Sequence, residues 1–489
     1  MNSTPRVKAC CFYAVFLWSY MNKDINNAYN VMSDEIGSLP VSSYNPLTAS
    51  FQTEEKYTAL QAINEAKRCL RCKAPMCMKG CPIGNNIPEF IHELSKGNMG
   101  AALSVINETS TLPAVCGRVC PHENQCQGNC VLGKKGEPVK IGKLESFLAD
   151  FATEMDLLRE GIPQKTRGRV AVIGSGPAGL TVAGQLARKG FHVTIFEAQQ
   201  ESGGVLLYGI PEYRLPKSVV RQELNKIEAL GVEFRNGVTV GTGNITVDSI
   251  FASGFDAIFI GTGTAIPKTI DIPGMNLYGV HQSIALLHQV TAYNDGAISQ
   301  RHIPIRKNEK VAIIGCGNVA MDAARTAIRF GADVTVLFRG SENEMTASER
   351  EYQEAVAEGV KFMWNVEARE FIGDERNKLK SIIIESPAGI SSEPFNRVFL
   401  AIGSRPANRI VSTTDGIEVD SKGYVKTHSR PCGMTTRRGV FAGGDVVHRP
   451  QTVVMAVKAA KEVADGIAQY VDAIKLLDHV NSLGQRNMR

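Results

Sequence analysis

The sequence predicts an α/β protein, with a cysteine-rich helical N-terminal domain followed by two nested Rossmann-like dinucleotide-binding domains. Eight cysteines are crowded between Cys69 and Cys130, within a stretch of helical periodicity. Two glycine-rich turns follow at residues 174–179 and 315–320, each between a β-branched run and a helical pattern. At 489 residues the chain is long enough for about three domains.

Composition excludes several functional classes. The 54 basic residues nearly balance the 49 acidic ones, and the net charge of +5 argues against a nucleic-acid or membrane-surface partner. Hydrophobic residues make up 43% of the chain, which excludes a disordered protein. The cysteines are concentrated in one region of a long chain rather than spread through a short secreted module, so we expect a reducing, cytoplasmic location.

Residues 1–50 are expected to be an N-terminal extension, either unstructured or not native. The apolar run Ala9–Tyr20 resembles a weak signal-peptide core, but it is too short to span a bilayer and lacks a small-x-small cleavage pattern. Met21 and Met32 offer alternative start sites, which favours an upstream overhang over secretion.

A helical domain is predicted over residues 51–165. Apolar residues recur there at spacings of three and four, and the polar stretch 161–168 indicates a linker to the next domain. The expected helices are Tyr57–Arg68, Pro88–Lys96, Met99–Glu108 and Ile141–Met155.

The cysteines of this domain fall into two groups of four. Each group contains a Cys-Pro step, and short loops of this kind bring several thiolates to one iron–sulfur cluster. The layout predicts two 4Fe-4S clusters; structural zinc, which prefers two close pairs, and a disulfide framework are the alternatives. The groups are Cys69-x2-Cys72-x4-Cys77-x3-Cys81 and Cys116-x3-Cys120, then Cys126-x3-Cys130.

The first glycine-rich turn predicts a dinucleotide site in a domain formed by residues 166–300 and 401–489. Its glycines permit a tight turn, so that backbone N–H groups at a helix start can approach a pyrophosphate. Glu197 ends the following strand, where a carboxylate can accept hydrogen bonds from ribose hydroxyls of FAD or NAD. The turn reads Gly174-Ser175-Gly176-Pro177-Ala178-Gly179.

The second turn predicts an NAD(P)H site in a domain over residues 301–400. Its sequence is Gly315-Cys316-Gly317-Asn318-Val319-Ala320, and Arg339 stands at the next strand end in place of an acid. A guanidinium there can pair with a 2′-phosphate, which favours NADPH; NADH and a solvated arginine are the alternatives. No Cys-x-x-Cys lies in this domain, so a thioredoxin-reductase-type disulfide relay is not expected.

The combined pattern, completed by Phe441-Ala442-Gly443-Gly444-Asp445, resembles the small subunit of NADPH-dependent glutamate synthase. The resemblance covers about Tyr57 to Ala468. The same module is similar to the N-terminal half of dihydropyrimidine dehydrogenase and to the large subunit of NADH-dependent ferredoxin:NADP oxidoreductases. The motifs are highly specific for this module, but they say little about its partner protein.

This resemblance implies ligands for two 4Fe-4S clusters. The first would use Cys69, Cys72, Cys77 and Cys130, and the second would use Cys81, Cys120 and Cys126 with a non-cysteine ligand. Glu145, on the last predicted helix, is the candidate for that fourth ligand, with a solvated glutamate as the alternative reading. On spacing, Cys116 competes for the same role.

The resemblance also implies nucleotide-binding residues. Arg339 is followed by Gly340 where the family often has a second basic residue, which weakens the NADPH preference; Arg350 on the next helix is not counted as a replacement. Ala401-Ile402-Gly403 would lie beside the nicotinamide. The residues implied for FAD are Gly176, Pro177, Ala178, Gly179, Glu197, Gly204, Val205, Arg214, Gly444, Asp445 and Thr452.

The implied function is an NADPH-dependent oxidoreductase without side-chain acid–base catalysis. Electrons would pass from NADPH through FAD and two 4Fe-4S clusters to a partner, for glutamate synthesis, in a hetero-oligomer. The partner would be a large glutamate synthase subunit or a ferredoxin-type redox protein, because the chain lacks a glutaminase domain and an FMN barrel. The alternatives are a subunit of an electron-bifurcating ferredoxin:NADP oxidoreductase and, from another class, a non-enzymatic metal-binding redox scaffold.

Overall fold

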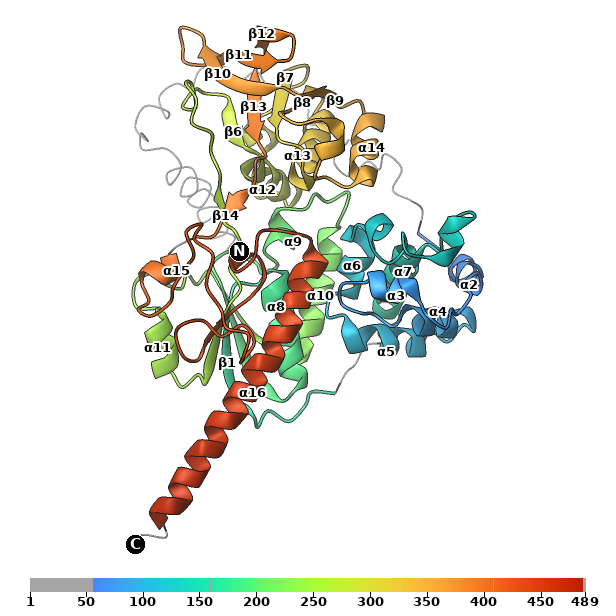
Figure 1. Ribbon diagram of the computed structural model, residues 1–489, viewed down its shortest axis with the longest axis vertical. Coiled ribbons are helices and arrows are strands. Elements are labelled where there is room, and N and C mark those ends of the chain that lie inside the picture. The colour runs from blue at the N-terminus through green and yellow to red at the C-terminus, as the bar shows by residue number, and fades with distance from the viewer. Residues whose placement is uncertain (1–55, 158–160, 408, 487–489) are drawn as a thin grey trace, which may run out of the picture.

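The computed structural model describes residues 56–157, 161–407 and 409–486. They form a helical lobe beside two α/β lobes (Figure 1). The extension predicted over residues 1–50 lies outside the described residues. No described helix is both long enough and apolar enough to cross a bilayer.

The helical lobe is built from short amphipathic helices around one core. Thr58 begins the first helix with a capping box, in which Thr58 and Gln61 satisfy each other's backbone N–H groups. The four helices predicted here lie within two residues of their predicted limits, and two short ones were not predicted. The helices are α2 (Ala59–Lys67), α3 (Met76–Gly80), α4 (Ile87–Ser95), α5 (Met99–Thr109), α6 (Pro113–Val119) and α7 (Ile141–Glu154).

The first α/β lobe contains a parallel five-stranded sheet in the order β15-β4-β1-β2-β3. The chain leaves β1 for β2 on one side and reaches β4 on the other, so the carboxyl end of β1 is a topological switch point, where such sheets bind ligands. Its elements are β1 (Gly168–Ile173), α8 (Pro177–Arg188), β2 (Phe191–Glu197), α9 (Val205–Tyr208), α10 (Lys217–Ala229), β3 (Glu233–Asn236), α11 (Val247–Ala252), β4 (Ala257–Ile260), α15 (Arg409–Ser412) and β15 (Val440–Ala442).

The second α/β lobe repeats this design in the order β6-β13-β7-β8-β9. Its sheet includes β6, which lies before the predicted limit at residue 301, because β6 pairs with β13 rather than with a strand of the first sheet. The elements are β6 (Val280–Gln282), α12 (Ser283–Asn294), β7 (Lys310–Ile314), α13 (Asn318–Arg329), β8 (Asp333–Phe338), α14 (Glu349–Ala357), β9 (Lys361–Trp364) and β13 (Arg397–Leu400).

Two small antiparallel sheets complete this lobe and its connection. One consists of β10 (Glu367–Gly373), β11 (Leu379–Ser386) and β12 (Gly389–Pro394). The other pairs β5 (Ile266–Pro267) with β14 (Ser404–Arg405) and so joins the two chain segments that run between the α/β lobes. The predicted fold class is confirmed: parallel nucleotide-type sheets follow a helical N-terminal domain.

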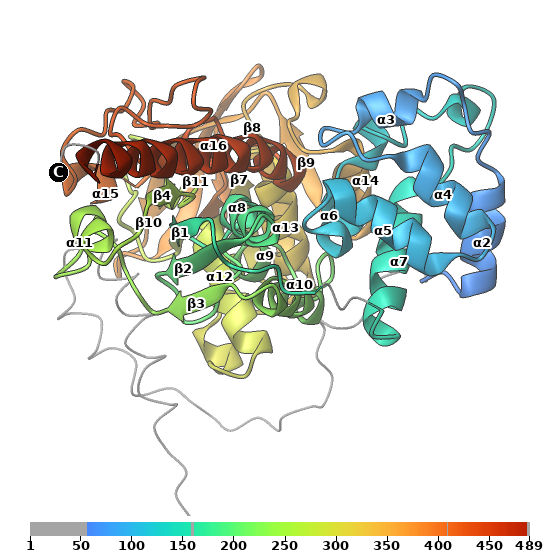
Figure 2. The same cartoon turned by 90° about the horizontal axis from the view of Figure 1, so that it is seen from below.

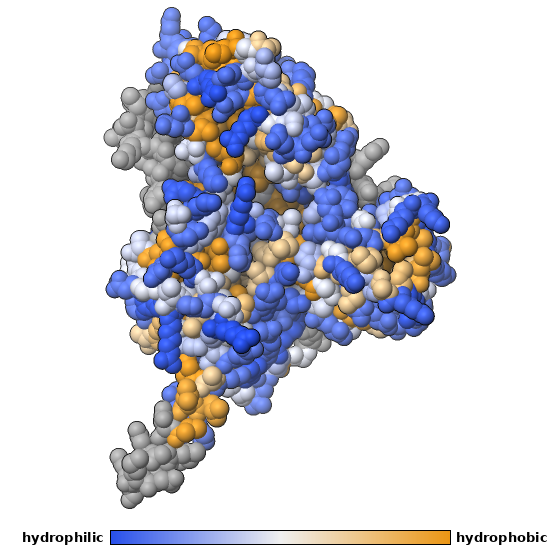
Figure 3. Space-filling model, in the orientation of Figure 1, coloured by the Kyte–Doolittle hydropathy of each residue, from blue (hydrophilic) through white to orange (hydrophobic). Residues whose placement is uncertain are grey.

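The last helix, α16 (Val453–Arg486), crosses the first lobe and packs against α8 (Figures 1 and 2). Val457, Ala460 and Ile467 of α16 are buried in the same core as the strands of this sheet. The helix then extends beyond the lobe, where Leu476 and Leu477 are exposed on an apolar area visible in Figure 3.

A buried charged network joins the two α/β lobes. The Arg214 guanidinium, from the first lobe, lies 2.8 Å from the carboxylates of Asp322 and Glu351 in the second. The Tyr213 ring packs against two guanidinium groups, with the Arg325 carbon 4.7 Å and the Arg329 carbon 4.0 Å from the ring centroid. Ion pairs at such depth are costly to break, because each separated charge would stay buried.

Candidate iron–sulfur and dinucleotide sites

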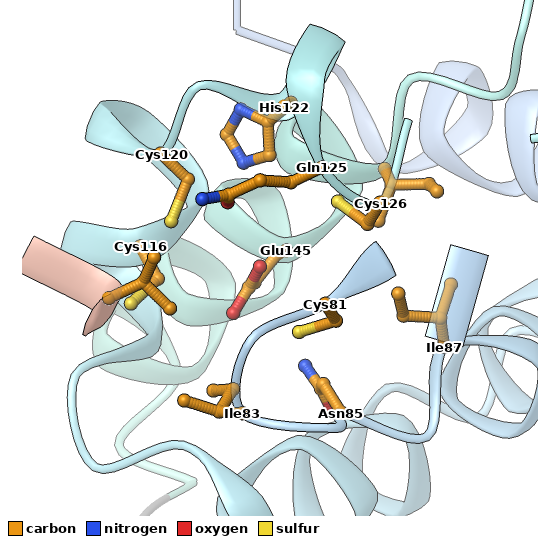
Figure 4. Close-up of a pocket in the computed structure, with 12 residues that line it drawn as sticks. Cys81, Ile83, Asn85, Ile87, Cys116, Cys120, His122, Gln125, Cys126 and Glu145 are labelled. Carbon is orange, nitrogen blue, oxygen red and sulfur yellow. The ribbon is translucent and has the colours of Figure 1, made fainter. Parts of the chain in front are cut away.

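The second cysteine group surrounds a pocket in the helical lobe (Figure 4). Cys116 lies on α6, Cys120 follows the end of that helix, and Cys126 comes from the next loop. Cys81, from the first group in the sequence, and Glu145 of α7 line the same pocket. Its other lining residues are Ile83, Asn85, Ile87, His122, Gln125, Ile141 and Val454.

Glu145 lies on the face of α7 that is turned toward this pocket. Its side chain points between the thiols in Figure 4, and the residue is only 7% exposed. Burial raises the pKa of its carboxyl to about 8, and the charge of Glu223 adds to this effect. An electropositive group in the pocket would therefore stabilise the ionised carboxylate.

Cys116 and Cys120 are neighbours on the opposite wall. A side-chain hydrogen bond with Cys116, together with burial, raises the pKa of the Cys120 thiol well above its ordinary value. Cys116 itself is 2% exposed. The pocket thus holds one sulfur more than the predicted ligand set requires, and Cys116 stays a competitor of Glu145.

The remaining four thiols of the region form a separate set. Burial raises the pKa of Cys77 to about 11, and the charges of Cys69, Cys130 and Cys72 raise it further. Burial also raises the pKa of Cys69, with smaller upward contributions from Cys130 and Cys72. Cys130, the last of the eight clustered cysteines in sequence order, therefore lies with the first group.

Two thiol-rich sets of this kind have the donor chemistry that iron–sulfur clusters require. A cubane takes one thiolate on each of four irons, so its ligands surround a body larger than a single ion. Among the described residues, no three His, Cys, Asp or Glu side chains lie close enough together to hold one metal ion. The donor types of both sets fit 4Fe-4S clusters, as the two groups of four cysteines predict.

The first glycine-rich turn has the geometry of a pyrophosphate cradle. Gly174 has a φ of +97°, and a Cβ on Gly179 would lie 1.9 Å from the Gly174 carbonyl oxygen. A Cβ on Gly176, by contrast, would meet nothing within 4 Å. The turn and the start of α8 thus approach each other closely, while open space remains beside Gly176 at the positive end of the helix.

Glu197 is buried at the end of β2 and fixed to this turn. Its Oε2 atom accepts hydrogen bonds from the Ser175 N–H at 2.9 Å and from the Ser175 hydroxyl at 2.5 Å. Its Oε1 atom accepts a hydrogen bond from the Gln199 N–H at 2.8 Å. The carboxylate is therefore held in one orientation beside the predicted ribose position.

The C-terminal part of the predicted FAD site lies against the same helix. A Cβ on Gly444 would lie 2.9 Å from the Ala178 Cβ, so the loop before α16 contacts the start of α8. The Thr452 hydroxyl oxygen is buried without a hydrogen-bond partner among the described residues, as expected of a group that awaits a ligand. Burial raises the pKa of Asp445 to about 6, while a hydrogen bond from the Gln451 backbone lowers it.

Gly204 and Val205 also lie in this region. The ion pairs of Arg214, by contrast, are formed elsewhere. Gly204 has a φ of +54°, and a Cβ there would lie 2.9 Å from the Gly176 Cα. Val205 begins α9 and is 47% exposed. The guanidinium of Arg214 is instead engaged with the second lobe, so its role toward FAD stays a prediction.

In the second glycine-rich turn, the backbone also closely approaches a neighbouring chain segment. Gly315 has a φ of +120°, and a Cβ there would lie 2.5 Å from the Ala401 carbonyl oxygen. A Cβ on Gly317 would lie 3.2 Å from the Thr346 hydroxyl. The Asn318 side-chain oxygen accepts a hydrogen bond from the Ser348 N–H at 3.1 Å and so ties α13 to the loop before α14.

Arg339 follows β8 at the edge of this site. It is exposed and makes no ion pair or hydrogen bond with any described residue. Arg350 is 49% exposed and pairs with Glu354, so it is committed elsewhere. The first site therefore has a carboxylate held by hydrogen bonds at its strand end. The second site has a guanidinium that forms no ion pair or hydrogen bond with the described residues.

Two functional features escaped the sequence analysis. Ser175 stands at a variable position of the glycine fingerprint, and only the folded turn shows that it orients Glu197. Val454, at the start of α16, lines the cysteine pocket more than 300 residues away in sequence. Neither contact has a local sequence signal, because each depends on tertiary packing.

Comparison with known protein families agrees with this architecture. Residues 48–157 match the family described as dihydropyrimidine dehydrogenase domain II, 4Fe-4S cluster. Residues 168–460 match the family of pyridine nucleotide-disulphide oxidoreductases. The predicted cofactor classes, 4Fe-4S clusters and a flavin with a pyridine nucleotide, are confirmed by these two matches.

Individual relatives extend the match over most of the chain. A glutamate synthase NADPH small chain of Halomonas elongata is 34% identical over 445 residues, covering 86% of this chain and 92% of that protein. The NAD-dependent dihydropyrimidine dehydrogenase subunit PreT of Salmonella typhimurium is 34% identical over 422 residues, covering 85% and 96%.

One solved structure shows the shared fold of the nucleotide lobes. FprA of Mycobacterium tuberculosis, in complex with NADPH, superposes with a TM-score of 0.52 at 17% identity. The match covers 65% of this chain and 89% of that one. The structural likeness shows the fold, and the family matches with the identity over nearly the whole length of the small chain establish that the protein is an oxidoreductase of the glutamate synthase small-subunit family.

Proposed function

We propose that this chain is an electron-transfer subunit that oxidises NADPH and delivers single electrons to a partner protein for glutamate synthesis. When bound, the nicotinamide supplies a hydride, the flavin accepts the electron pair, and the clusters carry electrons singly. The observation that carries the proposal is one proximity: Val454 of α16 lines the cysteine pocket, two residues after Thr452 of the predicted flavin site, whose hydroxyl oxygen is buried.

The residues would divide the work by position. Gly176 leaves room for the FAD pyrophosphate, Glu197 accepts hydrogen bonds from its ribose, and Thr452 gains the partner that its hydroxyl lacks. Gly315 opens the turn for NADPH, and Arg339 pairs with its 2′-phosphate. These groups bind and orient, and no side chain needs to transfer a proton.

The cysteine sets would each hold one 4Fe-4S cluster. The set near α16 supplies Cys81, Cys120 and Cys126, with Glu145 as fourth ligand, and is the cluster nearer the flavin. The outer set supplies four thiolates and is the cluster nearer the protein surface. Its members are Cys69, Cys72, Cys77 and Cys130.

Anaerobic purification with iron, sulfide and flavin analysis tests this assignment. The intact chain should contain about eight iron atoms, and Cys126→Ala should lower this to about four, because one cubane loses a ligand. Cys432→Ala, at a cysteine outside both groups, is the matched control and should leave the iron content unchanged. Colourless protein with stoichiometric zinc and no acid-labile sulfide would contradict the proposal.

The fourth ligand can be decided by two further variants. Glu145→Ala should alter the electron paramagnetic resonance spectrum of the reduced inner cluster, whereas Cys116→Ser should leave it unchanged. The reverse result would assign the position to Cys116.

A separate experiment identifies the partner protein. Affinity purification from the native host should recover a large glutamate synthase subunit. Recovery of a ferredoxin-linked flavoprotein, or of a partner like that of the dihydropyrimidine dehydrogenase subunits, would assign the same electron path to a different reaction.

A further inference from the structure

The outer cysteine set lies beneath an exposed apolar surface. Three apolar residues stand directly beside its cysteines in the sequence: Leu70 follows Cys69, Met76 precedes Cys77, and Val131 follows Cys130. Their exposed fractions are 61%, 43% and 39%. Cys69, Cys77 and Cys130 pack against the same hydrophobic core of the helical lobe, so these apolar neighbours belong to one lobe and flank one cysteine set. Leu70, Met76 and Val131 are here named the outer apolar patch.

The chain segments that carry this patch are rich in basic residues. The segment from Lys67 to Gly80 contains five basic residues and no acidic one, and Lys134 and Lys135 follow Val131. Arg68 pairs with Glu65, and Arg71 lies 3.7 Å from Glu89. The basic residues that are exposed and have no ion pair with any described residue are Lys67, Lys73, Lys79, Lys134 and Lys135.

The inner cysteine set is more enclosed than the outer set. Cys116 and Cys126 are buried in the pocket that Val454 of α16 also lines, whereas all four outer cysteines are partly exposed. By contrast, α2, which leads into the outer set, lies at the end of the lobe farthest from both parallel sheets in Figures 1 and 2. We therefore expect electrons to leave the protein through the outer set, whose cysteines are partly exposed.

We propose that the outer apolar patch and the exposed lysines of the same segments form the docking surface for an acidic redox protein. This inference rests on the proposed function, because it names where the electrons leave. Apolar side chains at the centre with unpaired charges at the rim match the anatomy of a transient protein interface. The lysines without an ion pair give this region positive charge, which steers a partner whose own surface is acidic.

The electron count is simple. Each NADPH becomes NADP⁺ with release of one proton and two electrons, and each electron reduces one molecule of a one-electron acceptor. Two acceptors are therefore reduced in succession at this surface for every NADPH oxidised.

Charge reversal of the holoenzyme tests the proposal with two protein acceptors of opposite charge. The variant Lys73→Glu/Lys79→Glu/Lys134→Glu should reduce cytochrome b5, an acidic haem protein, at least tenfold less efficiently in kcat/KM at low salt, because electrostatic steering raises association rates about 10- to 1,000-fold. Reduction of cytochrome c, a basic haem protein, should become faster. NADPH-driven reduction of menadione, a small neutral acceptor, should stay within about twofold of the wild-type rate.

A matched control carries the same charge change elsewhere. Lys307, Lys380 and Lys422 are exposed lysines of the α/β lobes, and their triple substitution by glutamate should leave cytochrome b5 reduction near the wild-type rate. The single variant Leu70→Ser tests the apolar centre: it should lower kcat/KM for cytochrome b5 severalfold at any salt concentration, with menadione reduction unchanged.

Two results would overturn the inference. The first is a charge-reversed enzyme that reduces cytochrome b5 as well as the wild type does, and the second is an equal loss in the remote control. Failure of the proposed function looks different, since wild-type enzyme would then fail to reduce menadione with NADPH or would contain no iron.

Discussion

The two glycine-rich turns differ most at the strand ends that face them. In the first lobe, Glu197 is buried and receives three hydrogen bonds, two of them from Ser175 inside the turn. In the second lobe, Arg339 is exposed and uncommitted. A carboxylate that recognises ribose hydroxyls must be oriented before the ligand arrives, whereas a guanidinium that attracts a phosphate acts through charge and can stay mobile.

The largest predicted effect concerns the last residue of each glycine-rich turn. Gly179→Ala places a Cβ 1.9 Å from a carbonyl oxygen, so the turn or α8 must move, and we expect a loss of at least about 3 kcal/mol in stability together with loss of FAD. Ala320, at the matching position of the second lobe, already accommodates its Cβ. Ala320→Gly should cost only about 1 kcal/mol, as measured by thermal unfolding and flavin content. Retention of FAD by Gly179→Ala would show that the two turns are equally tolerant.

The second prediction concerns the orientation of the acid. Glu197→Gln replaces one carboxylate oxygen by an amide NH₂ group. Because both oxygens accept hydrogen bonds, the NH₂ group would then point at an N–H or O–H group of Ser175 or at the N–H group of Gln199. We expect about 2 kcal/mol less binding energy for FAD, close to a 30-fold rise in Kd, because a buried donor loses its partner. Flavin release measured by fluorescence checks this. An unchanged Kd would mean that Glu197 contributes only to the turn.

The third prediction uses pH. The carboxyl of Asp445 has a pKa of about 6 because it is buried, so the folded chain keeps this proton to a higher pH than the unfolded chain does. Stability of the apoprotein should therefore fall as pH rises from about 4 to about 6 and then level off. Asp445→Asn removes this loss and should stabilise the apoprotein by on the order of 2 kcal/mol at pH 7, with a gain that vanishes toward pH 4. Denaturant unfolding at several pH values measures it, and a gain independent of pH would contradict the burial argument.

The smallest effect is expected at the uncommitted guanidinium. Arg339→Ala should raise KM for NADPH about tenfold, equivalent to about 1.4 kcal/mol, and change KM for NADH less than twofold. Arg350→Ala is the control, because its side chain pairs with Glu354. Equal losses for both nucleotides would remove the 2′-phosphate assignment from Arg339.

Much of the fold was predictable because its signals are local. A strand precedes and a helix follows each glycine-rich turn as predicted, since the turns and the apolar periodicity mark them. The sheet of β10–β12 and the pairing of β6 with β13 were not predicted, because strand partners distant in sequence leave no local pattern. For the site, residue types were predictable, whereas the partners of Arg214, 108 residues away or more, were not.

The charged network around Arg214 and Tyr213 has a consequence for turnover. Swinging one nucleotide lobe relative to the other would strand a guanidinium and two carboxylates in apolar surroundings, at a cost of several kcal/mol. The two lobes should therefore move as a single block through the catalytic cycle. Nucleotide exchange would then need no large lobe motion, and turnover should depend only weakly on solvent viscosity.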